Sequence, residues 1–453
     1  MASSFVDQFF DLLFSPIGLI GVMTGLIVAI QAQRSRLLCW GLFTLCCFSA
    51  SLGKLRDQFI SEPPALTFPL QQIRDAGRPL TIVFLVLLLL LSFTKVDSWR
   101  RQLFSYPIQY LAGVQLIVFL KTIFYGDLVF ALVAAVTFAS VLIMIRFGPS
   151  RWLSDDKNFR YAAFSMVMVA IIFIVLNAYQ AAVDIYPITF FHGRFLGTTG
   201  NPQHAAVLLA SILPCLMFVL EDQDQKWRQC CVLICIACVC LALLMTGSRT
   251  GMLMTIATLL FFYRNQKKSF FQMAIALCVV LAVALPMILK DGALLGADQT
   301  SAFSRFSSTE NTREEVWSAL WRTFNQYPIL GAPLRGERIV YGESSWLATA
   351  ANLGLVGLVP LCLFGTACVK MMIRLFDISK QQPVYYLQCS TVISGIACLL
   401  VGSFFEPFLL GNVSSTLLTM LLYLSLGQYI LERRKMQEHI KMRQQFLMES
   451  LLV

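Results

Sequence analysis

The sequence predicts an all-α fold, a polytopic bundle of about 12–13 transmembrane helices with one large helical loop. Three observations predict it. Only 13% of the 453 residues are charged, whereas soluble domains carry roughly 25%. The mean hydropathy is +0.71. Apolar runs of near-membrane length recur along the chain, and a spanning helix needs ~20 such residues to cross ~30 Å of hydrocarbon. Lipid is therefore the expected solvent for much of the protein.

The predicted spans are apolar runs bounded by charged residues, and those at 14–32 and 37–53 have the weakest pattern. In order they are 14–32, 37–53, 79–94, 104–123, 127–146, 160–183, 203–220, 229–246, 249–263, 270–289, 345–373, 386–406 and 412–431. Thirteen spans would put the N-terminus outside the cell, and twelve would put it inside.

Basic residues orient the bundle, because cytoplasmic loops of membrane proteins are enriched in Lys and Arg. Most of the 35 Lys and Arg fall in alternate loops on one side, together with the C-terminal tail. That side is predicted to be cytoplasmic. The other side then carries three sizeable loops, 54–78, 184–202 and 290–344, and the short turn 246–250.

The loop at 290–344 contains a predicted amphipathic helix. Residues 312–315, which read TREE, form a capping box with Thr312 at the N-cap and Glu315 at N3. Apolar residues then recur at helical spacing until Tyr327 and Pro328 end the helix. This stripe is expected to lie on the membrane surface or against the bundle.

The chain therefore divides into four predicted parts. Residues 1–183 form N-terminal transmembrane helices, and 184–289 with 345–431 form a catalytic transmembrane core. Residues 290–344 form the outer loop. Residues 432–453 form a cytoplasmic interfacial tail, because apolar residues there share one helix face among many basic ones.

Several functions are disfavoured by composition. The net charge of +10 is scattered over short loops, so no nucleic-acid partner is expected. The fourteen Cys lie inside apolar stretches, which favours packing over disulfides or a metal site. The chain has no phosphate-binding Walker loop, zincin motif or serine-hydrolase elbow. No cofactor and no metal are expected, so any enzyme here would act by positioning and electrostatics.

Arg249 is the most informative single residue. It lies in residues 246–251, which read TGSRTG, between two apolar runs with almost no loop. A charge so close to hydrocarbon is costly, and a guanidinium suits phosphate oxygens. Gly247 and Gly251 are expected to let a substrate approach the backbone. The alternative is an Arg that extends to lipid headgroups.

Arg194 precedes a Gly- and Thr-rich stretch that opens the next span, near a helix N-terminus that favours anions. Arg194 and Arg249 fall on the same predicted side, so both could bind one diphosphate. An ordinary surface-loop Arg is the alternative.

Acids and histidines also gather at this face. Glu343 lies where the large loop re-enters the membrane, and a desolvated carboxylate there could act as a general base. A simple helix-terminal acid is the alternative. Glu406, before Pro407, is a weaker candidate. His192 and His204 are expected to be structural.

These residues carry a resemblance to the O-antigen ligase and polymerase superfamily of bacterial envelope glycosyltransferases, over about residues 190–405. Its carriers are Arg194 with residues 200–202 (GNP), residues 246–251, Arg313 with Trp317, residues 328–331 (PILG), residues 343–347 (ESSWL) and residues 352–357 (NLGLVG).

The resemblance implies a C-type glycosyltransferase-like bundle in the bacterial inner membrane, with its active site facing the periplasm. Members take a glycan from an undecaprenyl diphosphate carrier. Ligases pass it to lipid A-core and polymerases to the next repeat unit. Carried over, Arg194 and Arg249 would hold the diphosphate, and Arg313 would support the site from the loop as a third diphosphate-binding residue.

The resemblance also implies a metal-independent reaction that inverts the anomeric carbon, because the acceptor hydroxyl attacks it directly while the arginines stabilise the departing diphosphate. Ligases usually carry His followed by Asn where this chain has Glu343 and Ser344. That departure favours a polymerase. A transporter or flippase of lipid-linked sugars is the rival hypothesis, although the early spans carry few charges. A structural membrane scaffold would leave both arginines unexplained.

Overall fold

The computed structural model describes residues 2–52, 62–93, 104–125, 128–153, 155–190, 193–264, 313–333, 343–410 and 413–451. Every regular element among them is a helix, which confirms the all-α prediction. The long helices are α2 (Pro16–Ala32), α3 (Arg36–Ser51), α5 (Gly77–Phe93), α6 (Tyr106–Tyr125), α7 (Leu128–Trp152), α8 (Asp156–Val183), α10 (Pro202–Glu221), α11 (Lys226–Met245), α12 (Arg249–Phe262), α15 (Glu314–Gln326), α16 (Ser345–Gln381), α17 (Tyr386–Phe405) and α18 (Ser415–Leu451). Short helices α1 (Ala2–Leu13), α4 (Leu70–Asp75), α9 (Tyr186–Thr189), η2 (Gly197–Thr199) and η3 (Pro383–Tyr385) complete the described part.

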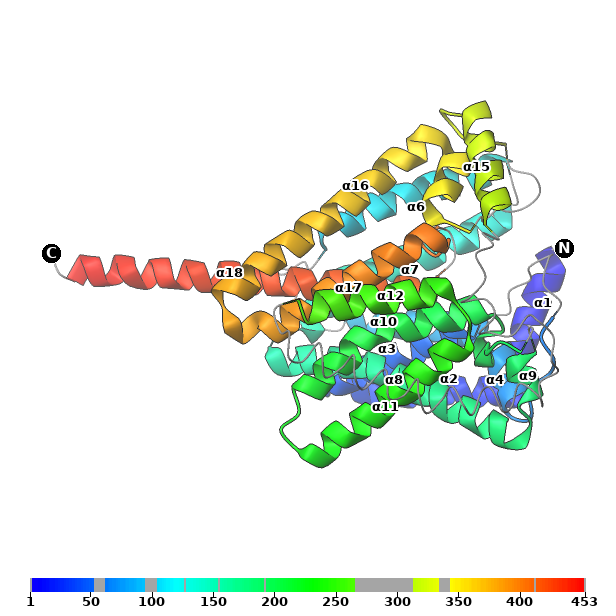
Figure 1. The fold of residues 1–453 in the computed structure, drawn as a ribbon, viewed down its shortest axis with the longest axis horizontal. Helices are drawn as coiled ribbons and strands as arrows, with labels where there is room; N and C mark the ends of the chain where they lie inside the picture. Colours follow the sequence, from blue (N-terminus) through cyan, green and yellow to red (C-terminus); the bar gives the residue numbers. More distant parts are fainter. Residues whose placement is uncertain are drawn as a thin grey trace.

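Seven of the described helices are long and apolar enough to cross a membrane, or up to eight if the bent pair at residues 7–32 is one span. Three others, α3, α5 and α12, are apolar but shorter. The chain is thus a polytopic α-helical membrane protein. Each predicted span coincides with a helix except 270–289, which lies outside the described residues. The predicted last span and tail form one continuous helix, α18, which extends beyond the bundle at the left of Figure 1.

Helix α10 lies at the centre of the bundle. In its most apolar window 83% of the residues are buried, the highest share among the candidate spans. It packs against α8, α11, α12 and α17 (Figure 1). Its N-terminus is fixed by Asn201, whose side chain accepts a hydrogen bond from the Gln203 amide at 2.8 Å. A rigid central helix therefore presents its first turn at one end of the molecule.

Helix α16 is broken near its start. Gly354 has φ 61° and ψ −157°, a conformation open to glycine but strained for other residues. The segment after α15 fills the break, because Leu355 and Val356 donate to the carbonyls of Pro328 and Ile329 at 2.8 and 3.2 Å. Two stretches of the sequence resemblance, residues 328–331 and 352–357, therefore meet here.

Helix α15 confirms the predicted amphipathic helix in the large loop, and its C-cap is Tyr327. Its start differs from the prediction. The helix begins at Glu314 with Arg313 in the N-cap position, one residue later than the capping box implies, and Thr312 lies outside the described residues. The Arg313 side chain makes no cap hydrogen bond. It is turned toward the ends of other helices.

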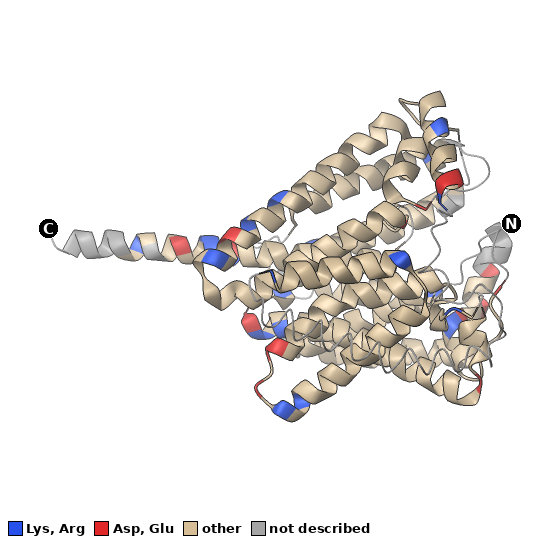
Figure 2. Ribbon diagram, in the orientation of Figure 1, with Lys and Arg blue, Asp and Glu red and all other residues tan. Residues whose placement is uncertain are grey.

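Side-chain contacts of two arginines connect helices at one end of the bundle. At the end away from α15, Arg264 after α12 donates to Ser390 of α17 at 2.9 Å and to Ser379 of α16 at 2.8 Å. Arg433 of α18 pairs with Asp156 at the start of α8. Figure 2 shows blue and red residues gathered toward both ends, with few along the middle of the long helices. That distribution fits an apolar belt between two polar faces.

Candidate active site

The turn between α11 and α12 is built to place Arg249 at a helix N-terminus. Gly247 has φ 59°, which reverses the chain directly after α11. Ser248 is the N-cap of α12, and its side chain accepts a hydrogen bond from the Gly251 amide at 3.2 Å. Arg249 is therefore the first helical residue, and its side chain is exposed. A cation beside the first amides of a helix makes a suitable site for an anion.

Gly251 does not have the role that the sequence suggested. A Cβ at this position would lie 2.8 Å from the Cβ of Ala206 in α10. The residue is buried, so its small size allows close packing of α10 and α12. The expectation that a substrate approaches this backbone is wrong for Gly251, because a neighbouring helix occupies the space.

Arg194 is fastened to the same turn that carries Arg249. Its Nε donates to the Thr246 carbonyl at 2.6 Å, and the following Phe195 amide donates to the Met245 carbonyl at 2.9 Å. The residue is only 3% exposed. The alternative of an ordinary surface Arg is therefore wrong. The two arginines come from adjoining segments, with Arg194 buried and Arg249 exposed.

Arg313 joins four elements at this end. Its Nη2 lies 2.9 Å from Glu406 Oε1 and 3.3 Å from the Thr250 hydroxyl of α12. Its Nη1 donates to the backbone carbonyls of Glu343, at 3.2 Å, and Phe405. Its Nε lies 3.1 Å from Glu343 Oε2, an ion pair by proximity, since that oxygen accepts no hydrogen bond from any described residue. The start of α15 is thus held to α12, α16 and α17.

Glu406 is the more buried of the two acids, contrary to the weight that the sequence gave it. Its side chain is 7% exposed, against 37% for Glu343. Burial raises the pKa of Glu406 to about 7, against the opposing charge and hydrogen bond of Arg313. The carboxylate of Glu343 raises this pKa further, and the charge of Arg194 lowers it. The one feature of the sequence that could have indicated the burial of Glu406 is its position directly after an apolar run.

Glu343 stands at the entry to α16. Ser344 is the N-cap, with its hydroxyl accepting from the Leu347 amide at 3.3 Å, so Glu343 precedes the helix. Its carboxylate faces Arg313. The Ser345 hydroxyl donates to the Glu406 carbonyl at 2.7 Å, which ties the start of α16 to the end of α17. The two acids therefore share one guanidinium on a fixed frame.

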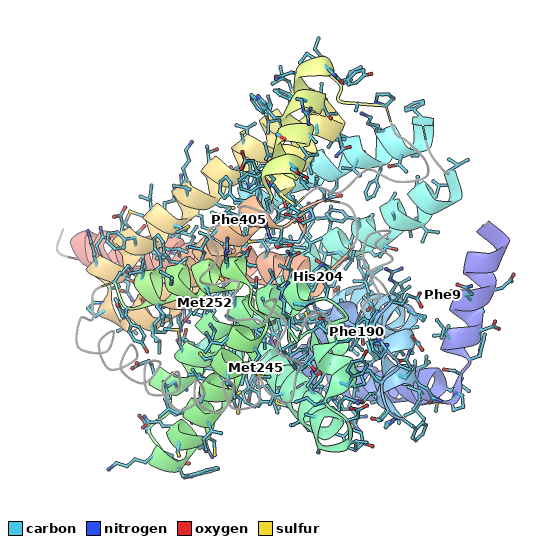
Figure 3. All side chains as sticks on the ribbon, turned by 45° about the vertical axis from the view of Figure 1, so that its right-hand side comes forward. Phe9, Phe190, His204, Met245, Met252 and Phe405 are labelled. Atoms are coloured by element: carbon cyan, nitrogen blue, oxygen red, sulfur yellow. The ribbon has the colours of Figure 1, made fainter. Side chains whose placement is uncertain are left out.

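Aromatic residues cover the cluster. The Arg313 guanidinium lies over the Phe405 ring at 5.7 Å, and Trp317 of α15 lies 5.9 Å from the same ring. The indole Nε1 of Trp317 is buried and finds no acceptor among the described residues. Figure 3 brings this end forward, with Phe405 at the end of α17 and His204 at the start of α10 labelled near its centre. His204 is exposed, and His192 lies outside the described residues.

The assembled group can bind an anion and accept a proton. Three arginines, the N-termini of α10 and α12, and two carboxylates lie on connected segments. Within the described part of the chain, no three His, Cys, Asp or Glu side chains lie close enough to hold a metal. The chemistry that these residues offer is charge stabilisation and proton transfer.

A comparison with known protein families finds a match in the same part of the chain that holds most of the candidate site. The profile of the O-antigen ligase family matches residues 233–362. The match covers most of α11, all of α12 and α15, and the first part of α16, and so includes Arg249, Arg313 and Glu343. Arg194 and Glu406 lie outside it. No curated protein matches the chain. The match supports the O-antigen ligase and polymerase superfamily, and with it a membrane protein of the glycosyl-transfer class.

Proposed function

We propose that this O-antigen ligase-like membrane protein transfers a glycan from an undecaprenyl diphosphate carrier to an acceptor hydroxyl at the periplasmic face. The acceptor is the next repeat unit in a polymerase, or lipid A-core in a ligase. The observation that carries the proposal is the attachment of buried Arg194 to the turn that presents Arg249 at a helix N-terminus. Two cations at a ready-made anion site suit a diphosphate.

We assign Arg249 to binding and stabilising the departing diphosphate. When the bond between the sugar C1 and the phosphate oxygen breaks, its electron pair passes to the diphosphate. The exposed guanidinium can contact those oxygens, and the first amides of α12 add partial positive charge. Buried Arg194 adds a second positive charge from behind the turn.

Arg313 takes a different role from the one that the resemblance implies. Its nitrogens contact Glu343, Glu406, Thr250 and the Phe405 carbonyl. We assign it as a positioning residue that orders the two acids, in place of a direct diphosphate ligand.

We assign Glu343 the role of general base, which accepts the proton of the acceptor hydroxyl. It is the more exposed acid, so an acceptor can reach it. The acceptor hydroxyl attacks C1 as its proton passes to Glu343, and the anomeric carbon is inverted. In this proposal Arg194 and Arg249 stabilise the charge of the departing diphosphate without a metal ion.

Polymerase activity is favoured over ligase activity by one feature, the Glu343-Ser344 pair at the place where ligases usually carry His and Asn. The basic loops at the opposite end and the family resemblance support our assignment of the site to the periplasmic face of the inner membrane.

Gene deletion tests the proposal directly. Surface polysaccharide from the deletion strain is separated by gel electrophoresis and compared with a strain complemented by the intact gene. A single repeat still attached to core indicates a lost polymerase. Loss of all attached glycan, with polymer accumulating on the carrier, indicates a lost ligase. Repeat units trapped at the inner leaflet would instead indicate a flippase and would contradict the proposal, as would an unchanged polysaccharide.

A further inference from the structure

A hollow lies at the end of the bundle away from the candidate active site. Helix α10 starts at the active-site end, and the hollow lies where it finishes and α11 begins. The volume is about 510 Å³, within the ~300–1,000 Å³ typical of small-ligand sites. Side chains from the starts of α3 and α8 complete its lining. None of these residues takes part in the proposed transfer reaction.

Part of the wall of the hollow is apolar and exposed. Phe218 of α10, which also lines the hollow, is 2% exposed, whereas Leu37 of α3 and Phe164 of α8 are 43% and 42% exposed. In a chain that spans a membrane, exposed apolar side chains near the end of a span contact lipid chains. This wall therefore suits an acyl chain.

The rim carries two cations and two carboxylates. Arg160 Nε lies 2.8 Å from Asp222 Oδ2, yet the Arg160 side chain remains 60% exposed. Arg228 and Asp224 line the same hollow and are exposed. Trp227 next to them is 65% exposed, as is common for Trp at the membrane–water interface. In Figure 2 blue and red segments adjoin at this corner, at the lower left. The rim is thus balanced in charge.

We propose that this hollow binds a phospholipid with a zwitterionic, primary-amine headgroup, such as phosphatidylethanolamine. The guanidinium groups of Arg160 and Arg228 suit the phosphodiester. The carboxylates of Asp222 and Asp224 suit an ammonium group, which donates three hydrogen bonds. A choline headgroup has no N–H to donate. A purely anionic headgroup would face both carboxylates without a cation of its own.

Native mass spectrometry of the full-length protein in detergent tests the proposal. The protein is titrated separately with phosphatidylethanolamine, phosphatidylcholine and phosphatidylglycerol of identical acyl chains. We expect phosphatidylethanolamine to bind about three- to tenfold more tightly than either of the others, the scale of one or two partly exposed charge contacts. Equal binding of the three lipids, or tighter binding of phosphatidylglycerol, would overturn it.

Paired substitutions locate the site. The variant D224N/R228Q removes one charge of each sign at two exposed positions, so it should fold. It is expected to lose the preference for phosphatidylethanolamine over phosphatidylcholine. Lys435→Gln removes an exposed charge on α18, outside the hollow, and should keep that preference. A preference that persists in D224N/R228Q would show that the lipid binds elsewhere. Glycan transfer plays no part in these readouts.

Discussion

At the scale of single residues, Arg313 is the side chain that connects the two acids of the candidate site. Its guanidinium pairs with one largely buried and one half-exposed carboxylate, and its side chain is 14% exposed. Removing one partner of a buried pair costs about 3–5 kcal/mol, because the remaining charge loses its compensation. Glu406 therefore depends on Arg313, whereas Glu343 keeps access to water.

Glu406 should give the protein a pH-dependent stability. Burial raises its pKa from 4.5 to about 7, so the folded state binds a proton that the unfolded chain releases. The contribution is fully present below pH 4.5 and is lost as the pH rises through about 7. We expect the thermal midpoint in detergent to fall between about pH 5 and pH 8, by the equivalent of up to about 3 kcal/mol.

Two variants check this prediction. Glu406→Gln should flatten the dependence on pH, because the amide does not titrate. Glu438→Gln removes a half-exposed acid that pairs with Arg434 along α18, and it should leave the slope unchanged. A slope that survives in Glu406→Gln would assign the effect to another group.

The broken helix α16 is the decisive feature at the scale of elements. Carbonyls of the segment after α15 accept hydrogen bonds from the second half of α16, and the Ala332 amide donates to the Ala351 carbonyl at 2.9 Å. Lys121 of α6 donates to the carbonyls of Leu330, at 2.8 Å, and Asn352. The described segment 313–333, which contains α15, is therefore joined to the two long helices α6 and α16 as well as to Glu343 and Glu406 through Arg313.

Gly354→Ala should loosen this junction. The new Cβ would lie 2.3 Å from the Ile329 carbonyl oxygen, and the backbone conformation alone costs about 1–3 kcal/mol for a non-glycine residue. We expect a lower thermal midpoint and faster proteolysis after α15. Gly113→Ala is the matched control, since a Cβ there meets nothing within 4 Å. Equal behaviour of the two variants would refute the account of the junction.

Most elements could be predicted from the sequence, because each long apolar run is a local signal. The bundle helices and the amphipathic α15 were expected at the positions where they occur. The break at Gly354 was not, because it depends on contacts with the segment that follows α15. The burial of individual side chains could not be predicted from the sequence either, because it depends on which helices pack around each residue. Arg194 is buried whereas Arg249 is exposed, and Glu406 is more buried than Glu343.

At the scale of the whole molecule, the two polar ends are assigned different faces of the membrane. The candidate site and α15 lie at one end, and the end of α12 with the long α18 extends from the other (Figure 1). The basic loops predict that the end with α18 is cytoplasmic.

Labelling tests that assignment. A fluorescent protein fused after residue 453 should be fluorescent in the cytoplasm. Ser318→Cys, on the exposed surface of α15, should react with a membrane-impermeant maleimide added to cells with a permeabilised outer membrane. Native cysteines set the background, which the unsubstituted protein measures. A dark fusion, together with a Ser318→Cys variant that labels no more than this background, would invert the topology.

The most direct measurement of the central claim is glycan transfer by the purified full-length protein in liposomes, with an undecaprenyl diphosphate-linked oligosaccharide as donor. Loss of one preplaced donor to a developing charge costs about 10²–10³ in rate. We therefore expect Arg249→Ala to lose transfer by that factor while remaining folded in the membrane. Arg374→Ala, an exposed residue in the half of α16 away from the site, should transfer normally. Transfer by Arg249→Ala at a rate within about twofold of the unsubstituted protein would contradict the account.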